Sequence, residues 1–85
     1  MTEGRRIVVV VRAGDEPRVA EALRAAVGLT LRGARVAVYR EAPAQAVASP
    51  RIARAVDTLR LLGHSVVDGA AGAALRGADA VEVWT

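Results

Sequence analysis

Five consecutive β-branched residues near the start of the chain, Ile7 to Val11, constrain the fold more than any other feature. A strand with one solvated face alternates apolar and polar residues, whereas a strand covered on both faces is apolar throughout. Cover on both faces is typical of parallel sheets, in which helices connect the strands. The run therefore predicts an α/β domain with this strand at the centre of its sheet.

Two later stretches carry the signals of a helix start. Asp15 and Glu16 precede Pro17, and Ser49 precedes Pro50. An acidic or hydroxyl side chain followed by proline is typical of the first turn of a helix. Apolar residues then recur at helical spacing, and a glycine ends each stretch. The same corner of glycine, short turn and strand recurs at three positions, namely Gly33, Gly63 and Gly77.

Further strands are expected at residues 36–39, 65–68 and 80–84, with at most two helical turns between the last two. Glu82 interrupts the valines of the last strand, which we therefore expect at an edge. The result is a small three-layer α/β sandwich with the element order β-α-β-α-β-α-β. We expect a four-stranded parallel sheet in the order 2-1-3-4, within one domain over residues 1–85.

The composition excludes several classes of function. The chain has no cysteine, and all twelve of its basic residues are arginine, so no thiol or lysine chemistry is available to it. Its net charge of +3 is spread along the chain without interleaved aromatic residues, which argues against nucleic-acid binding. We find neither a signal peptide nor a membrane-spanning run, and we expect a cytoplasmic protein without metal or cofactor.

The carboxyl ends of the strands are where a parallel sheet binds ligands, near the point at which the strand order reverses. In the order 2-1-3-4 that point lies between the first and third strands. The residues that follow these two strands are the candidates for a small-molecule or anion site, namely Gly14, Asp15, Glu16, Asp68 and Gly69. The alternative interpretation of Asp15 and Glu16 is helix capping. The only histidine, His64, is expected in a surface turn at the opposite edge.

Asp15-Glu16-Pro17 after a strand also resembles the start of a response-regulator receiver domain, whose acidic pair holds Mg²⁺. Asp68 would then stand where such a domain is phosphorylated. The acids lie three or four residues beyond Val11, however, and the family's later lysine has no counterpart. The chain is also one βα unit short of that pattern. A degenerate receiver-like domain is therefore only the lesser alternative, and we identify no catalytic residue.

Most of the chain resembles the DsrE/DsrF-like family, which includes sulfur-relay subunits. The resemblance lies in the valine run, the helix Ala22-Leu23-Arg24-Ala25-Ala26-Val27-Gly28-Leu29 and the segment Gly33-Ala34-Arg35-Val36. It also includes Ala78-Asp79-Ala80-Val81, where the chain enters its last strand. It implies a homo-oligomer or a partnership with a related α/β subunit. Some members carry a persulfide on a cysteine after the third strand, and this chain has Asp68-Gly69 there instead.

Outward apolar and small residues favour association independently of that resemblance. We expect the contact surface to include Ala25, Gly28, Leu29, Leu61 and Trp84. The function that the sequence favours is a non-catalytic, DsrE-like oligomeric subunit, linked to sulfur metabolism but unable to carry a persulfide. The alternative is a module that binds a small anionic ligand at the site described above.

Overall fold

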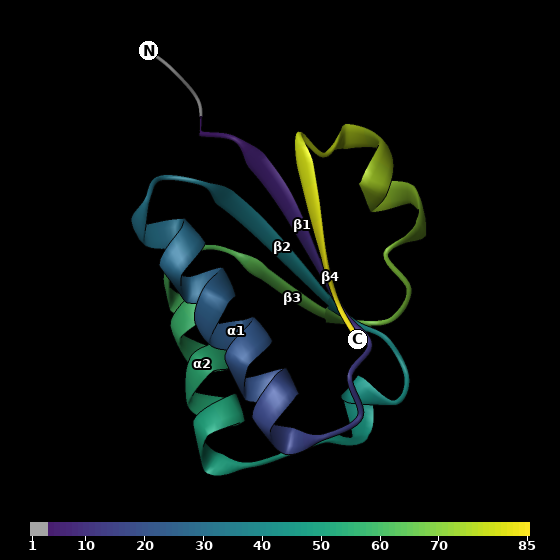
Figure 1. Cartoon of the computed structure of the whole chain (residues 1–85). Coiled ribbons are helices and arrows are strands. Elements are labelled where there is room, and N and C mark those ends of the chain that lie inside the picture. The colour runs from purple at the N-terminus through teal and green to yellow at the C-terminus, as the bar shows by residue number, and fades with distance from the viewer. Residues whose placement is uncertain (1–3) are drawn as a thin grey trace.

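The computed structural model describes residues 4–85. All four strands are parallel and the elements alternate as expected, which confirms the α/β class (Figure 1). The elements are β1 (Arg6–Val11), α1 (Glu16–Leu31), β2 (Arg35–Arg40), the 3-10 helix η1 (Ala44–Ala46), α2 (Pro50–Leu61), β3 (Ser65–Asp68), the 3-10 helix η2 (Gly72–Gly77) and β4 (Ala80–Trp84). None of the helices within residues 4–85 is both long and apolar enough to cross a membrane.

The two α-helices begin where the sequence predicts. The Asp15 carboxylate accepts a hydrogen bond from the backbone N–H of Arg18 at 3.3 Å, and the Ser49 hydroxyl accepts one from Ile52 at 3.2 Å. Each cap satisfies one of the N–H groups that a first helical turn leaves without a partner. The local sequence therefore determines where both helices enter the fold.

The glycine corner that recurs in the sequence is present at two of its three positions. Gly33 and Gly63 have φ angles of 92° and 87°, the left-handed conformation with which helices commonly end. Gly77 is not among the glycines of residues 4–85 with positive φ. The element before Gly77 is a 3-10 helix, and the chain leaves it in an extended conformation at Ala78, with φ −85° and ψ 139°.

The strand order is β3-β2-β1-β4, which corrects one part of the expected order 2-1-3-4. β1 is central and β4 is at an edge, as predicted, but β3 pairs with β2 rather than with β1. The residues of β3 explain its place at the other edge. It has four residues, begins with Ser65, ends with Asp68 and buries only Val66. A short strand with polar ends suits an edge, whereas β2 buries both Val36 and Val38.

This strand order decides which face of the sheet each connection covers. The steps from β1 to β2 and from β2 to β3 run in one direction, so right-handed crossovers place α1 and α2 on the same face. The step from β3 to β4 returns past β2 and β1, and it places η2 on the opposite face (Figure 1). The three layers are therefore a pair of helices, the sheet and a thin third layer formed by η2.

The two faces of the sheet carry cores of very different size. Alternate residues of β1 point to opposite faces. Val9 and Val11 pack with Leu23 and Leu59 in a large cluster under the two α-helices. On the other face, the small cluster has only three buried residues, Val8, Val10 and Ala71. Most of the buried apolar surface is thus on the side of α1 and α2.

Candidate functional site

The predicted ligand site lies at the carboxyl edge of the sheet, but its two halves are not adjacent. Gly14, Asp15 and Glu16 follow β1, and Asp68 and Gly69 are at the end of β3. Because β2 lies between these strands, two strand spacings of about 4.8 Å each separate the two groups. The structure places both groups at one edge without joining them in a single crevice between β1 and β3.

Gly14 and Asp15 have local structural roles at this edge. Asp15 caps α1 through the bond to Arg18 described above. A side chain at Gly14 would place its Cβ 2.9 Å from Cγ of Pro43, so the loop after β2 approaches this glycine closely. These contacts support the interpretation of this stretch as a helix start.

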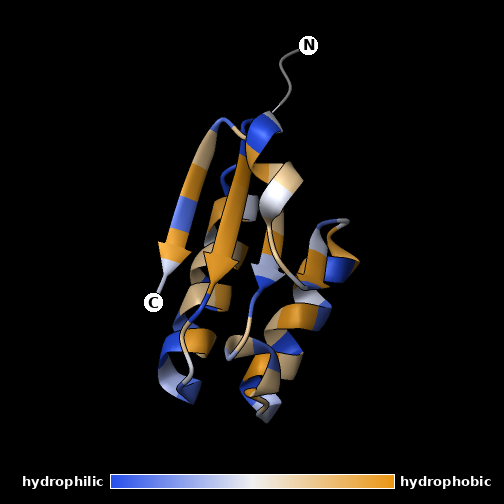
Figure 2. Ribbon diagram, turned by 90° about the vertical axis from the view of Figure 1, so that its right-hand side faces the viewer, coloured by the Kyte–Doolittle hydropathy of each residue, from blue (hydrophilic) through white to orange (hydrophobic). Residues whose placement is uncertain are grey.

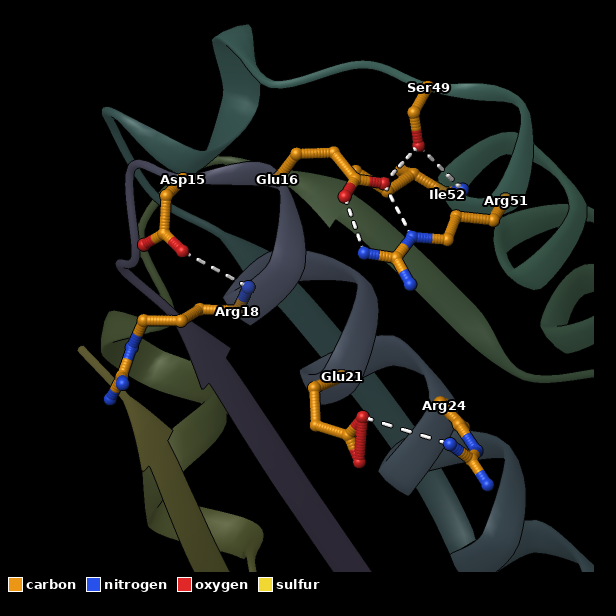
Figure 3. A network of polar contacts seen from close by, with 8 residues as sticks. All are labelled: Asp15, Glu16, Arg18, Glu21, Arg24, Ser49, Arg51 and Ile52. Carbon is orange, nitrogen blue, oxygen red and sulfur yellow. Dashed lines mark hydrogen bonds and ion pairs between the residues drawn. The ribbon is translucent and has the colours of Figure 1, made fainter.

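Glu16 makes the most extensive side-chain contacts of the predicted site (Figure 3). Its Oε2 accepts hydrogen bonds from the Ser49 hydroxyl at 2.6 Å and from Nε of Arg51 at 2.7 Å, and Oε1 accepts one from Nη2 of Arg51 at 2.5 Å. The bonds from Arg51, then the one from Ser49, lower the pKa of Glu16 from 4.5 to about 2. This carboxylate therefore stays ionised and joins the first turns of α1 and α2.

A second ion pair connects the ends of β1 and β2. Nε of Arg12 donates to Oε1 of Glu41 at 2.7 Å, and Oε2 of Glu41 accepts from the backbone N–H of Ala71 at 3.1 Å. The bond from Arg12 is the larger cause, and the bond from Ala71 the smaller, of a lowered pKa of Glu41. Through Ala71, this carboxylate also holds the segment that leads into η2.

Asp68 is paired in the same way at the end of β3. Nε of Arg40 donates to its Oδ1 at 2.7 Å, and the backbone N–H of Gly69 donates to the carbonyl of Arg40 at 3.0 Å. Asp68 and Arg40 are also register partners in the sheet. Asp68, which the receiver-like alternative would make the phosphorylated residue, is thus one partner of a cross-strand ion pair.

These contacts determine what the carboxyl edge can do chemically. Glu16 and Glu41 accept from arginines, which lowers their pKa values and leaves them little basicity for proton transfer. Asp68 is held by its bond from Arg40. Within residues 4–85, no group of three or more His, Cys, Asp or Glu side chains is arranged to hold a metal ion. The arrangement is suited to connecting loops and helix starts to one another.

The residues predicted from the sequence include Glu16 and Asp68 but neither Glu41 nor the arginines that pair with these acids. Arg12 directly follows β1 and Arg40 is the last residue of β2, so their positions at the carboxyl ends of these strands were the available signal. Arg51 is 35 residues from Glu16, and only the parallel packing of α1 and α2 brings the two together. No local pattern predicts that pair.

The residues expected at an association surface fall into three environments. Leu61 is 88% exposed on the outer side of α2. Ala25 and Gly28 are half-buried on α1, and a Cβ at Gly28 would meet nothing within 4 Å. Leu29 and Trp84 pack against the large core instead of projecting outward. Of the five, Leu61 is the one with a prominent exposed side chain.

A different apolar surface is exposed on the face of the sheet that carries η2. Val81 and Val83 of β4 are 45% and 50% exposed on this face. Figure 2 looks onto it and shows η2 crossing in front of the sheet while β4 lies uncovered at the left. Leu75 of η2 is also exposed. One side of the sheet is thus incompletely covered at β4.

Comparison of the chain with protein-family models, curated proteins and solved structures finds no match in any of the three.

Proposed function

We propose that the chain is a non-catalytic subunit that acts by association, with a second copy covering the open face of β4. The observation that carries the proposal is the exposure of Val81 and Val83 on one face of a parallel sheet. Parallel sheets occur almost only with both faces covered, and here η2 leaves β4 uncovered. A domain of this size also buries a modest share of its surface alone, so association would stabilise it.

A second copy fits this surface better than it fits the edge of β4. Two valine surfaces related by a twofold axis bury one another without complementary charges. Pairing through the strand edge, in the register centred on Glu82, would place two carboxylates opposite each other. Contact through the face that carries Val81 and Val83 avoids this repulsion, because Glu82 points to the other side of the sheet.

The resemblance to the DsrE/DsrF-like family remains a prediction, and it is compatible with association because members of that family form oligomers. A link to sulfur metabolism depends only on this resemblance, since no cysteine is present to hold a persulfide. We do not extend the proposal to ligand binding by Gly14, Asp15, Glu16, Asp68 and Gly69. The ion pairs of Glu16 and Asp68 already occupy their carboxylates.

Sedimentation velocity over a range of micromolar concentrations tests the proposal. We expect a concentration-dependent dimer, and we expect Val83→Glu to make the chain monomeric. Val83→Thr keeps a β-branched side chain and should weaken the dimer without disturbing the strand. Leu61→Glu is the matched control, because it adds the same charge at an exposed leucine on the helical side. Far-UV circular dichroism checks that each variant is folded.

A wild-type chain that is monomeric at every concentration would overturn the proposal. A dimer that Leu61→Glu disrupts, while Val83→Glu and Val83→Thr leave it intact, would place the contact on the helices and would also overturn it. Larger assemblies that Val83→Glu reduces to monomers would support the proposed surface.

A further inference from the structure

A hollow of about 300 Å³ lies on the η2 face, over the amino-terminal halves of β1 and β2 and the start of β3. Its wall on one side is η2, and none of its lining residues belongs to β4. It is therefore distinct both from the proposed dimer surface and from the carboxyl edge. Its volume is at the small end of the range for ligand sites in proteins.

Two arginines stand side by side at this hollow. Arg6 and Arg35 are register partners on β1 and β2, and both share the parity of Val8 and Ala37, which places them on the η2 face. Both residues line the hollow and carry a positive charge, so an anion bound there would be attracted by both. No acidic side chain from residues 4–85 lines the hollow.

The position of Arg6 is fixed by its backbone. Its N–H donates to Oδ2 of Asp79 at 2.8 Å, and its carbonyl accepts from the N–H of Asp79 at 2.7 Å. A Cβ at Gly77 would lie 3.4 Å from Nη1 of Arg6, so the guanidinium lies against the wall formed by η2. The nearby carboxylate of Asp79 accepts a backbone bond and does not line the hollow.

Three neutral donors also line the hollow. Nδ1 of His64 accepts the backbone N–H of Val36 at 3.2 Å, which assigns the proton of the neutral ring to Nε2. Within the described chain, that Nε2–H and the hydroxyls of Tyr39 and Ser65 have no hydrogen-bond partner. The floor is apolar, with Val8 buried and Ala37 half-buried, and Ala74 in the η2 wall is also half-buried.

From this arrangement we infer that the hollow binds a small organic anion. Its phosphate or carboxylate group would lie beside Arg6 and Arg35, and its apolar part would lie over Val8 and Ala37. His64, Ser65 and Tyr39 would donate to the remaining oxygens. Because both arginines are exposed, binding would weaken as the ionic strength rises.

Two-dimensional ¹H–¹⁵N NMR titration of the labelled full chain tests the inference, with phenyl phosphate as the probe. We expect the largest amide shifts at residues 6–8, 35–39, 63–65 and 74–78. Inorganic phosphate, which lacks the apolar part, and benzyl alcohol, which lacks the charge, should each bind more weakly. Arg6→Gln should weaken phenyl phosphate binding by about tenfold. Arg54→Gln, an equal loss of charge on α2, should change it by less than about twofold.

Ala37→Leu provides a second test that leaves all charges in place. The larger side chain would fill part of the hollow, so it should reduce binding at least as much as Arg6→Gln while the chain stays folded. Shifts spread over all arginines, equal effects of Arg6→Gln and Arg54→Gln, or equal binding of inorganic and phenyl phosphate would overturn the inference. It does not depend on the proposed dimer, which the Val83 variants test separately.

Discussion

Glu16 joins the N-terminal ends of the two helices through a single carboxylate. Its bonds from Arg51 and Ser49 hold its pKa at about 2, below the ordinary value of 4.5. Because the pKa in the folded state is the lower one, the unfolded chain takes up the proton first as the pH falls. The stabilising effect of ionised Glu16 is therefore fully present above about pH 4.5 and is lost as the pH falls towards 2.

We accordingly expect Glu16→Gln to lower the Tm at neutral pH, because an amide cannot form the ion pair with Arg51. The difference in Tm between wild type and variant should narrow below pH 4.5 and be mostly lost by pH 2, because the unfolded chain takes up its proton before the folded chain over this range. Thermal unfolding followed by circular dichroism at a series of pH values measures this. Glu21→Gln is the control, since its carboxylate is 57% exposed and 3.9 Å from Arg24. A difference that stays constant with pH would contradict the prediction.

Residues of one short stretch differ in how far the sequence reveals their roles. The capping role of Asp15 depends on the next three residues, so the sequence predicts it and the structure confirms it. The partners of Glu16 lie 33 and 35 residues further along the chain. They depend on the packing of α1 beside α2, which no local pattern specifies.

At the scale of the helix, two glycines should respond to alanine in opposite ways. Gly63 ends α2 with φ of 87°, where a Cβ is strained. Gly28 lies within α1, and a Cβ there would meet nothing within 4 Å. We expect Gly63→Ala to lower the free energy of unfolding by about 1 kcal/mol or more and Gly28→Ala to raise it by about 0.5–1 kcal/mol.

Urea unfolding of the two variants beside the wild type measures these changes, and each variant serves as the control for the other. A Gly63→Ala variant as stable as the wild type, or a Gly28→Ala variant less stable than it, would contradict the prediction for that position. If Gly28 instead forms part of an association surface, Gly28→Ala would change the dimer as well. Unfolding at several protein concentrations would reveal that effect.

The sequence predicts the elements better than their arrangement. The valine run and Glu82 correctly place β1 at the centre and β4 at an edge. The predicted position of β3 was wrong, because right-handed crossovers are compatible with both of the strand orders 2-1-3 and 3-2-1. The choice between them depends on whether α2 packs beside α1 or on the opposite face. Both helices have an apolar face for the sheet, and periodicity does not tell which face of the sheet each one covers.

Across the whole molecule, the strand order produces two unequal faces. α1 and α2 cover one face with a continuous core, whereas η2 contributes no buried residue of its own to the other. The exposed valines of β4 and the hollow beside Arg6 both lie on this thinly covered face. The sequence did not predict the exposed valines or the hollow, because both depend on how little of the sheet η2 covers.

Because the two faces are unequal, we expect η2 to unfold locally at a lower free energy than α1. The N–H groups of Ala74 and Ala78 donate to Ala71 and Leu75 within or beside η2, where few apolar contacts hold them. The amides of Leu23 and Ala26, by contrast, belong to residues of α1 whose side chains are fully buried. We expect hydrogen exchange at Ala74 and Ala78 to proceed through local opening that is nearly independent of denaturant. Exchange at Leu23 and Ala26 should require opening of the whole domain.

Native-state hydrogen exchange at increasing, sub-denaturing urea concentrations measures both groups in one experiment. Equal free energies of exchange with equal urea dependence would contradict the prediction, because they would make η2 part of a single cooperative unit. η2 also forms the wall of the hollow, so an anion bound there would slow exchange at Ala74 and Ala78 more than at Leu23. A dimer formed through Val81 and Val83 would instead protect the amides of β4. The two proposals therefore predict protection of different segments on the same face of the sheet.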